Sequence, residues 1–188
     1  MTSMTRQFAA LTILLLAAAC TPPLVATPPS EPIQIGFYSV TPQTEWNRAM
    51  MTRKEVWTVD GYALQALRFL DVADGQTLSG ETDPDGKAPV YRKSMLPNEI
   101  QEFIVETLVA GGWANVKPSG LQPAKFGSMP GFRFSYAMVS EDGLDYDGIV
   151  LGTVKDDVLH IIMYSGTHLH YFPKNAKDVE KLFASIRT

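Results

Sequence analysis

Residues 157–164 read DVLHIIMY, and this stretch constrains the fold more than any other. Successive side chains of a strand point to opposite sides of the sheet. Both resulting sets are apolar: Leu159, Ile161 and Met163 on one face, and Val158, Ile162 and Tyr164 on the other. A strand that is apolar on both faces needs cover on both, so the pattern predicts a sheet packed between two layers.

Two amphipathic helices are predicted to provide that cover. Apolar residues recur at helical spacing over 97–110, where Pro97 suits the first turn and the glycines at 111–112 end the helix. A second helix is predicted after Asn175, which has the chemistry of an N-cap. Its apolar stripe consists of Val179, Leu182, Phe183 and Ile186.

The other elements are predicted to be strands, at 35–40, 54–59, 62–72, 131–139, 146–154, 157–164 and 167–172. The polar, glycine-containing stretches 71–87 and 111–122 are predicted to be loops. Short turns between consecutive strands favour antiparallel pairing. The expected fold is therefore α+β, an antiparallel sheet of about six to seven strands with two amphipathic helices packed on it.

Five runs of this chain resemble small proteobacterial lipoproteins that have no assigned function. They are YSVTPQTEWN, EVWTVDGYALQALRF, LPNEIQEFIVETL, GFRFSY and LHYFPKNAKDVEKLFASI, which contains the predicted C-terminal helix. The element order also resembles the PsbP-like sandwich, although only in layout. This second resemblance implies an accessory or binding role, and a fold by itself does not define a function.

The first 19 residues have the pattern of an export signal. Arg6 precedes an apolar run at about 8–16, which is too short to cross a bilayer as a helix. The run ends in Leu-Ala-Ala-Ala and then Cys20, the only cysteine of the chain. This order resembles the lipobox of bacterial lipoproteins. The lipobox usually has leucine three positions before the cysteine, where this chain has Ala17, and Leu16 is one position earlier. We expect Cys20 to be acylated, with palmitate or similar chains, and to become the mature N-terminus.

Residues 20–33 are predicted to be an extended tether. The segment from Cys20 to Pro32 contains five prolines, and at about 3.1 Å per residue it would hold the domain up to about 40 Å from the membrane. A single α+β domain is expected over 34–188. Thr21 replaces the aspartate that commonly retains lipoproteins in the inner membrane, which favours the outer membrane, facing the periplasm.

The charge balance argues against nucleic acid as a partner. The chain has 20 acidic and 16 basic residues, and removal of 1–19 takes away only Arg6 from these. No basic cluster appears in the remainder. We expect a membrane partner through the N-terminal lipid, together with an envelope protein or a small ligand, and no cofactor.

Candidates for chemistry are few. His168 and His170, two apart in a predicted strand, would leave the same face and are the candidate metal ligands. A third ligand would have to come from elsewhere, for example His160. An alternative function is a small hydrolase or metal-dependent enzyme that uses His160, His168, His170 and Ser165. No nucleophile elbow or zinc motif supports it, so a non-enzymatic binding or accessory role is the leading hypothesis.

The acidic run at 141–147 resembles a calcium loop only in part, because the full spacing of ligands is absent. We interpret it as a hairpin turn. Ser128 also lacks a nucleophile frame. The tryptophans and the tyrosines Tyr136 and Tyr164 are expected in or near the core.

Overall fold

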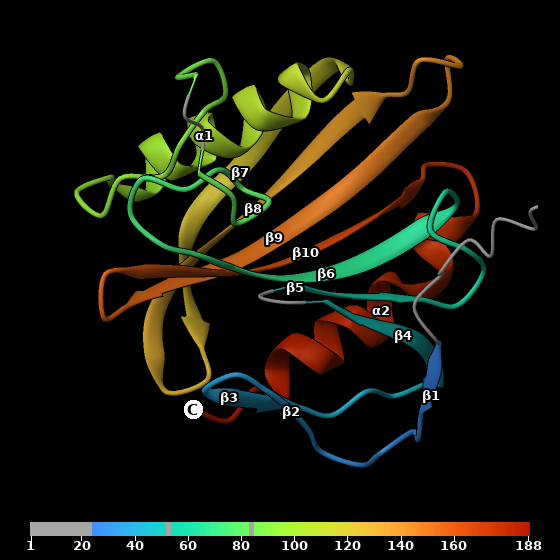
Figure 1. Cartoon of the computed structure of the whole chain (residues 1–188). Coiled ribbons are helices and arrows are strands. Elements are labelled where there is room, and N and C mark those ends of the chain that lie inside the picture. The colour runs from blue at the N-terminus through green and yellow to red at the C-terminus, as the bar shows by residue number, and fades with distance from the viewer. Residues whose placement is uncertain (1–23, 52–53, 83–84) are drawn as a thin grey trace, which may run out of the picture.

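The computed structural model describes residues 24–51, 54–82 and 85–188. Within them, eight strands form one antiparallel sheet in the order β1-β4-β5-β6-β10-β9-β8-β7 (Figure 1). Their bounds are β1 (Val25–Thr27), β4 (Trp46–Met51), β5 (Lys54–Thr58), β6 (Gln65–Val72), β7 (Ala114–Phe126), β8 (Met129–Val139), β9 (Asp145–Lys155) and β10 (Val158–Thr167). The α+β class is confirmed, and the sheet has more strands than the six to seven expected.

Three layers are visible in Figure 1, with helix α1 (Pro97–Ala110) above the sheet and helix α2 (Tyr171–Ala184) below it. A separate hairpin of β2 (Ile33–Ile35) and β3 (Tyr38–Val40) lies on the α2 side. The strand that is apolar on both faces is β10, which lies inside the sheet between β6 and β9. Its two faces contribute to two separate hydrophobic clusters, as the sequence predicts.

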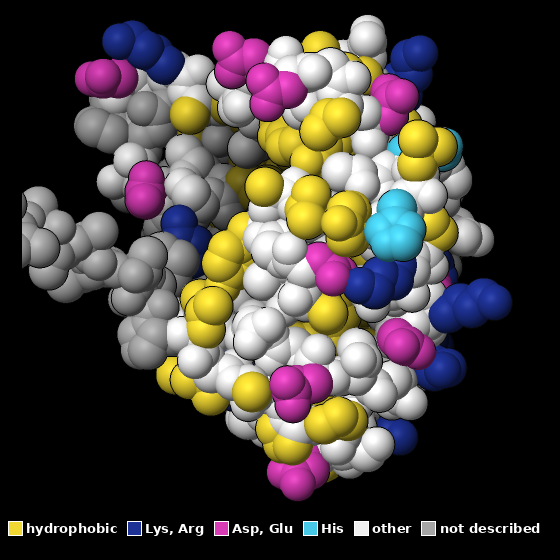
Figure 2. All heavy atoms as spheres, turned by 90° about the vertical axis from the view of Figure 1, so that its right-hand side faces the viewer, with side chains coloured by type: hydrophobic (Ala, Val, Ile, Leu, Met, Phe, Trp, Pro, Cys, Tyr) yellow, Lys and Arg dark blue, Asp and Glu magenta, His cyan; other side chains and the backbone are white. Residues whose placement is uncertain are grey.

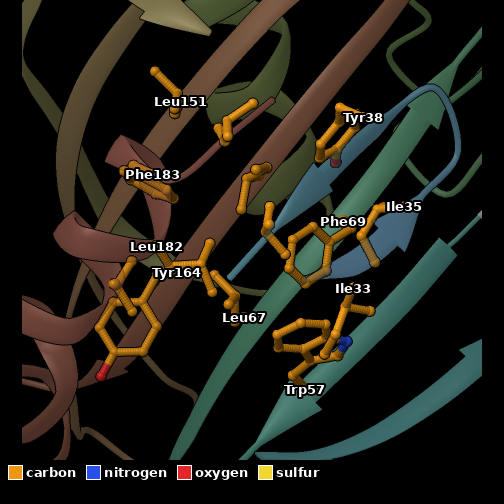
Figure 3. Packing of buried hydrophobic residues seen from close by; sticks show 14 of the residues in the cluster. Ile33, Ile35, Tyr38, Trp57, Leu67, Phe69, Leu151, Tyr164, Leu182 and Phe183 are labelled. Atoms are coloured by element: carbon orange, nitrogen blue, oxygen red, sulfur yellow. The ribbon is translucent and has the colours of Figure 1, made fainter. Parts of the chain in front are cut away.

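The cluster on the α2 face joins the helix, the sheet and the β2–β3 hairpin. In Figure 3, Phe183 lies beside Leu151, while Ile33 of the hairpin lies against Trp57 of the sheet. Trp57 and Tyr164 are fully buried here. The cluster on the α1 face holds Ile100, Phe103 and Ile104 of α1, all buried against β8, β9 and β10.

Two glycines of β9 make room for aromatic rings on the α1 face. A Cβ atom on Gly148 would overlap the ring of Tyr136, and one on Gly152 would lie 2.6 Å from Cζ of Phe132. Each ring belongs to the neighbouring strand β8, in register with its glycine. The rings therefore lie directly over bare backbone, which closes the sheet surface under α1.

Helix α1 begins and ends as predicted, with Pro97 in the first turn and Gly111 at the C-cap. Helix α2 begins earlier than predicted. Residues 168–170 form a turn and Tyr171 is already helical, so the predicted strand at 167–172 is wrong, and Asn175 lies buried inside the helix rather than at its cap. Pro173 is compatible with the first turn, because N–H groups there have no intrahelical partner.

The predicted loop at 111–122 is wrong in most of its length, since β7 begins at Ala114. This strand is the sheet edge, is mostly exposed and contains two register shifts. Pro118 and Pro123 are tolerated because an edge strand has one unpaired side. Exposure removed the alternation that identifies a strand, so the sequence pattern was that of a loop.

The predicted strand at 35–40 is instead divided between two strands. Gly36 adopts a φ of 54° in the turn between β2 and β3, a conformation that suits glycine. Strand β4 was not predicted, although Trp46 and Trp57 both lie in the core as expected.

The expected tether at 20–33 is not wholly outside the fold. Its residues 25–27 form β1, which pairs with β4 from Val25 opposite Arg48 to Thr27 opposite Trp46. Thr27 is buried, and its Oγ1 accepts a hydrogen bond of 2.9 Å from the backbone N–H of Trp46. This bond satisfies a buried backbone donor and ties the short proline-flanked segment to the sheet.

Candidate functional site

Cys20, the predicted lipidation site, lies outside the described residues. The described part of the chain contains no helix that is both long and apolar enough to span a membrane. The description starts at Leu24, one residue before β1. The chain that follows the expected anchor therefore joins the sheet edge at once.

His168 and His170 do not share a strand face, so the geometry that motivated a metal pair is absent. Both lie in the turn between β10 and α2. His168 is held at one end of the sheet, where its Nδ1 is 2.6 Å from Oδ2 of Asp147. The His170 ring packs edge-on against Tyr171, with centroids 4.8 Å apart.

His160 and Ser165 are also separated. His160 is 8% exposed, with Nδ1 2.5 Å from Oδ1 of Asp71 and its ring edge-on to Phe37. Ser165 is buried and accepts a 3.2 Å hydrogen bond from Arg68. Five positions apart on one strand, the two side chains leave opposite faces and lie about 16 Å apart along β10. They do not form a nucleophile–base pair.

Within the described ranges, no three or more His, Cys, Asp or Glu side chains are grouped so that they could hold a metal ion. The acidic stretch 141–147 covers the β8–β9 turn and the start of β9. Ser140 stabilises the turn by accepting hydrogen bonds from the N–H groups of Gly143 and Leu144. Ser128 lies in another hairpin turn, with Oγ 2.7 Å from Oγ1 of Thr188.

A shallow groove lies on the α2 face of β7, β8 and β9. It consists of two adjoining hollows of about 330 and 340 Å³, which share Lys117, Ala137 and Asp147. One hollow extends to His168 at the end of the sheet, and the other extends to Phe172 in the first turn of α2. The remaining lining residues include the polar Asn115, Ser119 and Ser135 as well as apolar and aromatic residues such as Val139 and Tyr136.

The groove forms because α2 covers only part of its face of the sheet. Asp147 and Ile149 of β9 are two apart and share that face; Ile149 is buried in the α2 cluster, while Asp147 borders the groove. Ala137 and Ser135, on the paired strand β8, are too small to fill the space. The groove offers the carboxylates of Asp145 and Asp147, one ammonium group and several hydroxyls, which suits binding of a polar group.

The end of the sheet beside the groove, seen in Figure 2, carries a broken band of hydrophobic side chains with charges of both signs among them. The β5–β6, β8–β9 and β10–α2 turns meet here. The Tyr146 hydroxyl donates a hydrogen bond to the carbonyl of Ala63, and the backbone N–H groups of Thr167 and His168 donate to the carbonyls of Leu64 and Asp145. Each turn exposes one large apolar side chain: Tyr62 (41%), Leu144 (51%) and Leu169 (91%).

The buried tyrosines are not acid–base groups. Burial raises the pKa of Tyr38, Tyr136 and Tyr164 above the ordinary range. The Tyr164 hydroxyl donates hydrogen bonds to the carbonyl oxygens of Tyr171 and Phe172, at 2.8 and 3.1 Å. At neutral pH these hydroxyls are protonated, and that of Tyr164 connects β10 to the first turn of α2.

A separate hollow, of about 360 Å³, lies at the C-terminus between β7 and the end of α2. Phe183, Ile186 and Thr188 are among its lining residues. We call it the C-terminal hollow. It contains no histidine, cysteine or carboxylate side chain and none of the predicted site residues.

Sequence reasoning missed the groove because it missed β7, which contributes Asn115, Lys117 and Ser119. The only available signal was the alternation of polar residues at these three positions, and the proline at 118 concealed it. Asp147 was noticed only as one acid of a turn. Its contact with His168 joins two segments 21 positions apart, which no local pattern indicates.

No protein-family model and no curated protein sequence matches this chain. Among solved structures, cyanobacterial PsbP (CyanoP) from Synechocystis sp. PCC 6803 is similar, with a TM-score of 0.56 and 9% identity over 91% of this chain and 95% of that chain. The Ran-binding protein Mog1p of Saccharomyces cerevisiae is also similar, with a TM-score of 0.51 and 8% identity over 84% of this chain and 94% of that chain. The PsbP-like layout expected from the sequence is thus confirmed, at the level of fold alone.

Two other structures match with TM-scores under 0.5. LpqN, involved in cell envelope biogenesis of Mycobacterium tuberculosis, gives 0.49 and 9% identity over 87% of this chain and 90% of that chain. A protein from Bacteroides thetaiotaomicron VPI-5482 gives 0.47 and 13% over 81% of this chain but only 45% of its own length.

Proposed function

We propose that the protein is a bacterial envelope lipoprotein, acylated at Cys20, whose single domain has a binding or accessory role without catalysis. The observation that carries the proposal is the order Leu-Ala-Ala-Ala-Cys at the end of a short apolar run, followed almost directly by a folded domain. The anchor would hold the domain at the outer membrane, facing the periplasm, because Thr21 follows the cysteine.

The absence of an assembled catalytic set in the described residues supports the non-enzymatic role. His160, Ser165 and His168 each have a separate structural partner: Asp71, Arg68 and Asp147 respectively. The groove between β7–β9 and α2 is the place where we expect an envelope protein segment or a small polar ligand to bind. Its paired His168 and Asp147 and its Lys117 provide both donors and acceptors.

The anchoring is tested by mass spectrometry of the mature N-terminus and by fractionation. The native protein should start at an acylated Cys20, sediment with membranes, resist high salt and enter a detergent phase, because two or more long acyl chains give stable anchoring. Cys20→Ala should abolish acylation and the detergent partition. An unmodified Cys20, or a mature chain that starts at another residue, would exclude the lipoprotein assignment.

A further inference from the structure

We propose that the sheet edge formed by β1 and β4, with its exposed residues Leu24, Val25 and Met50, lies against the lipid bilayer. We call these three side chains the apolar edge. The inference rests on the lipid anchoring proposed above and adds an orientation to it. The domain would contact the membrane through one defined edge rather than stand away from it.

The first support is the length of chain between the anchor and the fold. Leu24 is four positions after Cys20, and four residues span at most about 14 Å even when fully extended. The polar layer on each side of a bilayer is about 5–7 Å thick. Because β1 is fixed in the sheet by its register with β4 and by Thr27, the sheet edge is held close to the headgroups. A separation of about 40 Å is therefore no longer available.

The second support is the chemistry of the edge. Leu24, Val25 and Met50 are 54%, 48% and 62% exposed, and they are three of the large apolar residues that the described surface leaves open. The register of β1 with β4 pairs Val25 with Arg48, so Val25 and Met50 leave the same face of this edge, while Leu24, continued opposite Ala49, leaves the other face. The edge thus exposes apolar side chains on both of its faces, close to where the chain leaves for the anchor.

The third support is charge. No acidic residue occurs from position 21 to 30, although the chain as a whole is acidic. Glu55, which pairs with Met50 across the ladder, is neutralised within the protein. It forms an ion pair with Arg48 and accepts a 2.5 Å hydrogen bond from Nε1 of Trp57. The carboxylate opposite Met50 is therefore paired within the protein and does not face lipid headgroups, which are often anionic, as a free charge.

The test uses the full mature lipoprotein, with a single added cysteine that carries an environment-sensitive dye. Once Cys20 is acylated the chain has no other thiol, so Met50→Cys can be labelled alone. Val109→Cys is the matched control. Val109 is 55% exposed on α1, which packs against β7 at the opposite edge of the sheet, about 34 Å away across seven strand spacings. Both proteins are reconstituted in vesicles of phosphatidylethanolamine and phosphatidylglycerol.

We expect the dye at position 50 to show blue-shifted emission, loss of quenching by aqueous iodide and strong quenching by brominated lipid chains. The dye at position 109 should be quenched by iodide alone. Equal quenching by iodide at both positions would overturn the proposal. So would protection at position 50 that disappears as the lipid-to-protein ratio is raised, because it would assign the edge to a second copy of the chain.

Mass spectrometry of Cys20 on the same samples separates the two proposals. An acylated protein whose label at position 50 stays in water refutes the orientation and leaves the anchoring intact. An unacylated protein refutes the anchoring, and the orientation is refuted with it. The variant Met50→Glu in an acylated chain carrying the label at Val25→Cys should weaken the protection, because it adds a charge to the edge.

Discussion

The glycine at position 148 allows the sharpest test of the packing under α1. Its backbone is not in the left-handed region, so Gly148→Ala introduces no backbone strain. The added methyl would instead overlap the ring of Tyr136, which is 3% exposed and enclosed by the α1 cluster. The cost of the substitution is therefore purely steric.

The size of the effect follows from how little the ring can move. Overpacking of a core costs typically 1–3 kcal/mol, and a ring fully enclosed by its neighbours cannot rotate away. We expect Gly148→Ala to lower the free energy of unfolding by about 3 kcal/mol. Tyr136→Ala alone should cost about 3–5 kcal/mol, by analogy with other large aromatic residues. In that background the ring is gone, and Gly148→Ala should cost less than about 0.5 kcal/mol, since alanine limits the unfolded chain more than glycine does.

The assay is urea unfolding of residues 21–188, followed by tryptophan fluorescence. Trp46 and Trp57 are 1% and 0% exposed, so their emission reports the loss of the core. The four proteins form a double-mutant cycle, and equal slopes against urea are required for the comparison. The reasoning fails if Gly148→Ala costs under about 0.5 kcal/mol alone, or if its cost is the same with and without the Tyr136 ring.

Two further results are expected. Phe183→Ala should lower the free energy of unfolding by about 3 kcal/mol, which is the low end of the range for phenylalanine. The value is low because the ring borders the C-terminal hollow, so its surroundings can relax. A loss below about 0.5 kcal/mol in the same assay would mean that α2 is not packed through this ring. In alkaline titration followed by tyrosinate absorbance, Tyr38, Tyr136 and Tyr164 should ionise only when the protein unfolds. Their folded pKa values are raised by burial, so the stability they contribute is complete below pH about 10 and declines as the pH rises further; ionisation of every tyrosine near pH 10 in the folded protein would contradict this.

The elements that the sequence predicted well are those whose packing repeats along the chain. Helix α1 has both a periodic apolar face and local end signals, Pro97 and Gly111. Strand β10 is apolar on both faces because it is covered on both. In both elements, the positions that are apolar in the sequence are the positions that are buried in the structure, so local pattern and tertiary packing agree.

The elements that it missed depend on contacts far along the chain. Strand β7 has an exposed, irregular edge, and its pairing with β8 rather than its own composition makes it a strand. Strand β1 pairs with β4, and its Thr27 accepts a hydrogen bond from the backbone of Trp46, 19 positions away. The first turn of α2 accepts a hydrogen bond from the buried hydroxyl of Tyr164, at the carbonyl of Tyr171. None of these partners is visible in a local window.

The candidate site shows the same limit. The sequence placed His168 and His170 on one face of a strand, and a turn separates them because β10 ends at Thr167. The partner of His168, Asp147, comes from β9, and the sequence indicates it only as one acid of a predicted hairpin turn and strand. Spacing along the chain identified residues capable of chemistry, but only the register between strands decided which of them meet.

The sheet order connects the anchor to the groove. Strand β1 is one edge of the sheet, and β7, which lines the groove, is the other. If the β1–β4 edge rests on lipid, β7 lies at the opposite edge of the sheet, about 34 Å away, and the groove is on the side of the sheet that is remote from the lipid. A short connection into β1 then does more than retain the protein at a membrane. Because β1 is hydrogen-bonded into the sheet, the proposed anchor would fix which edge faces the lipid and would leave the groove open to a partner.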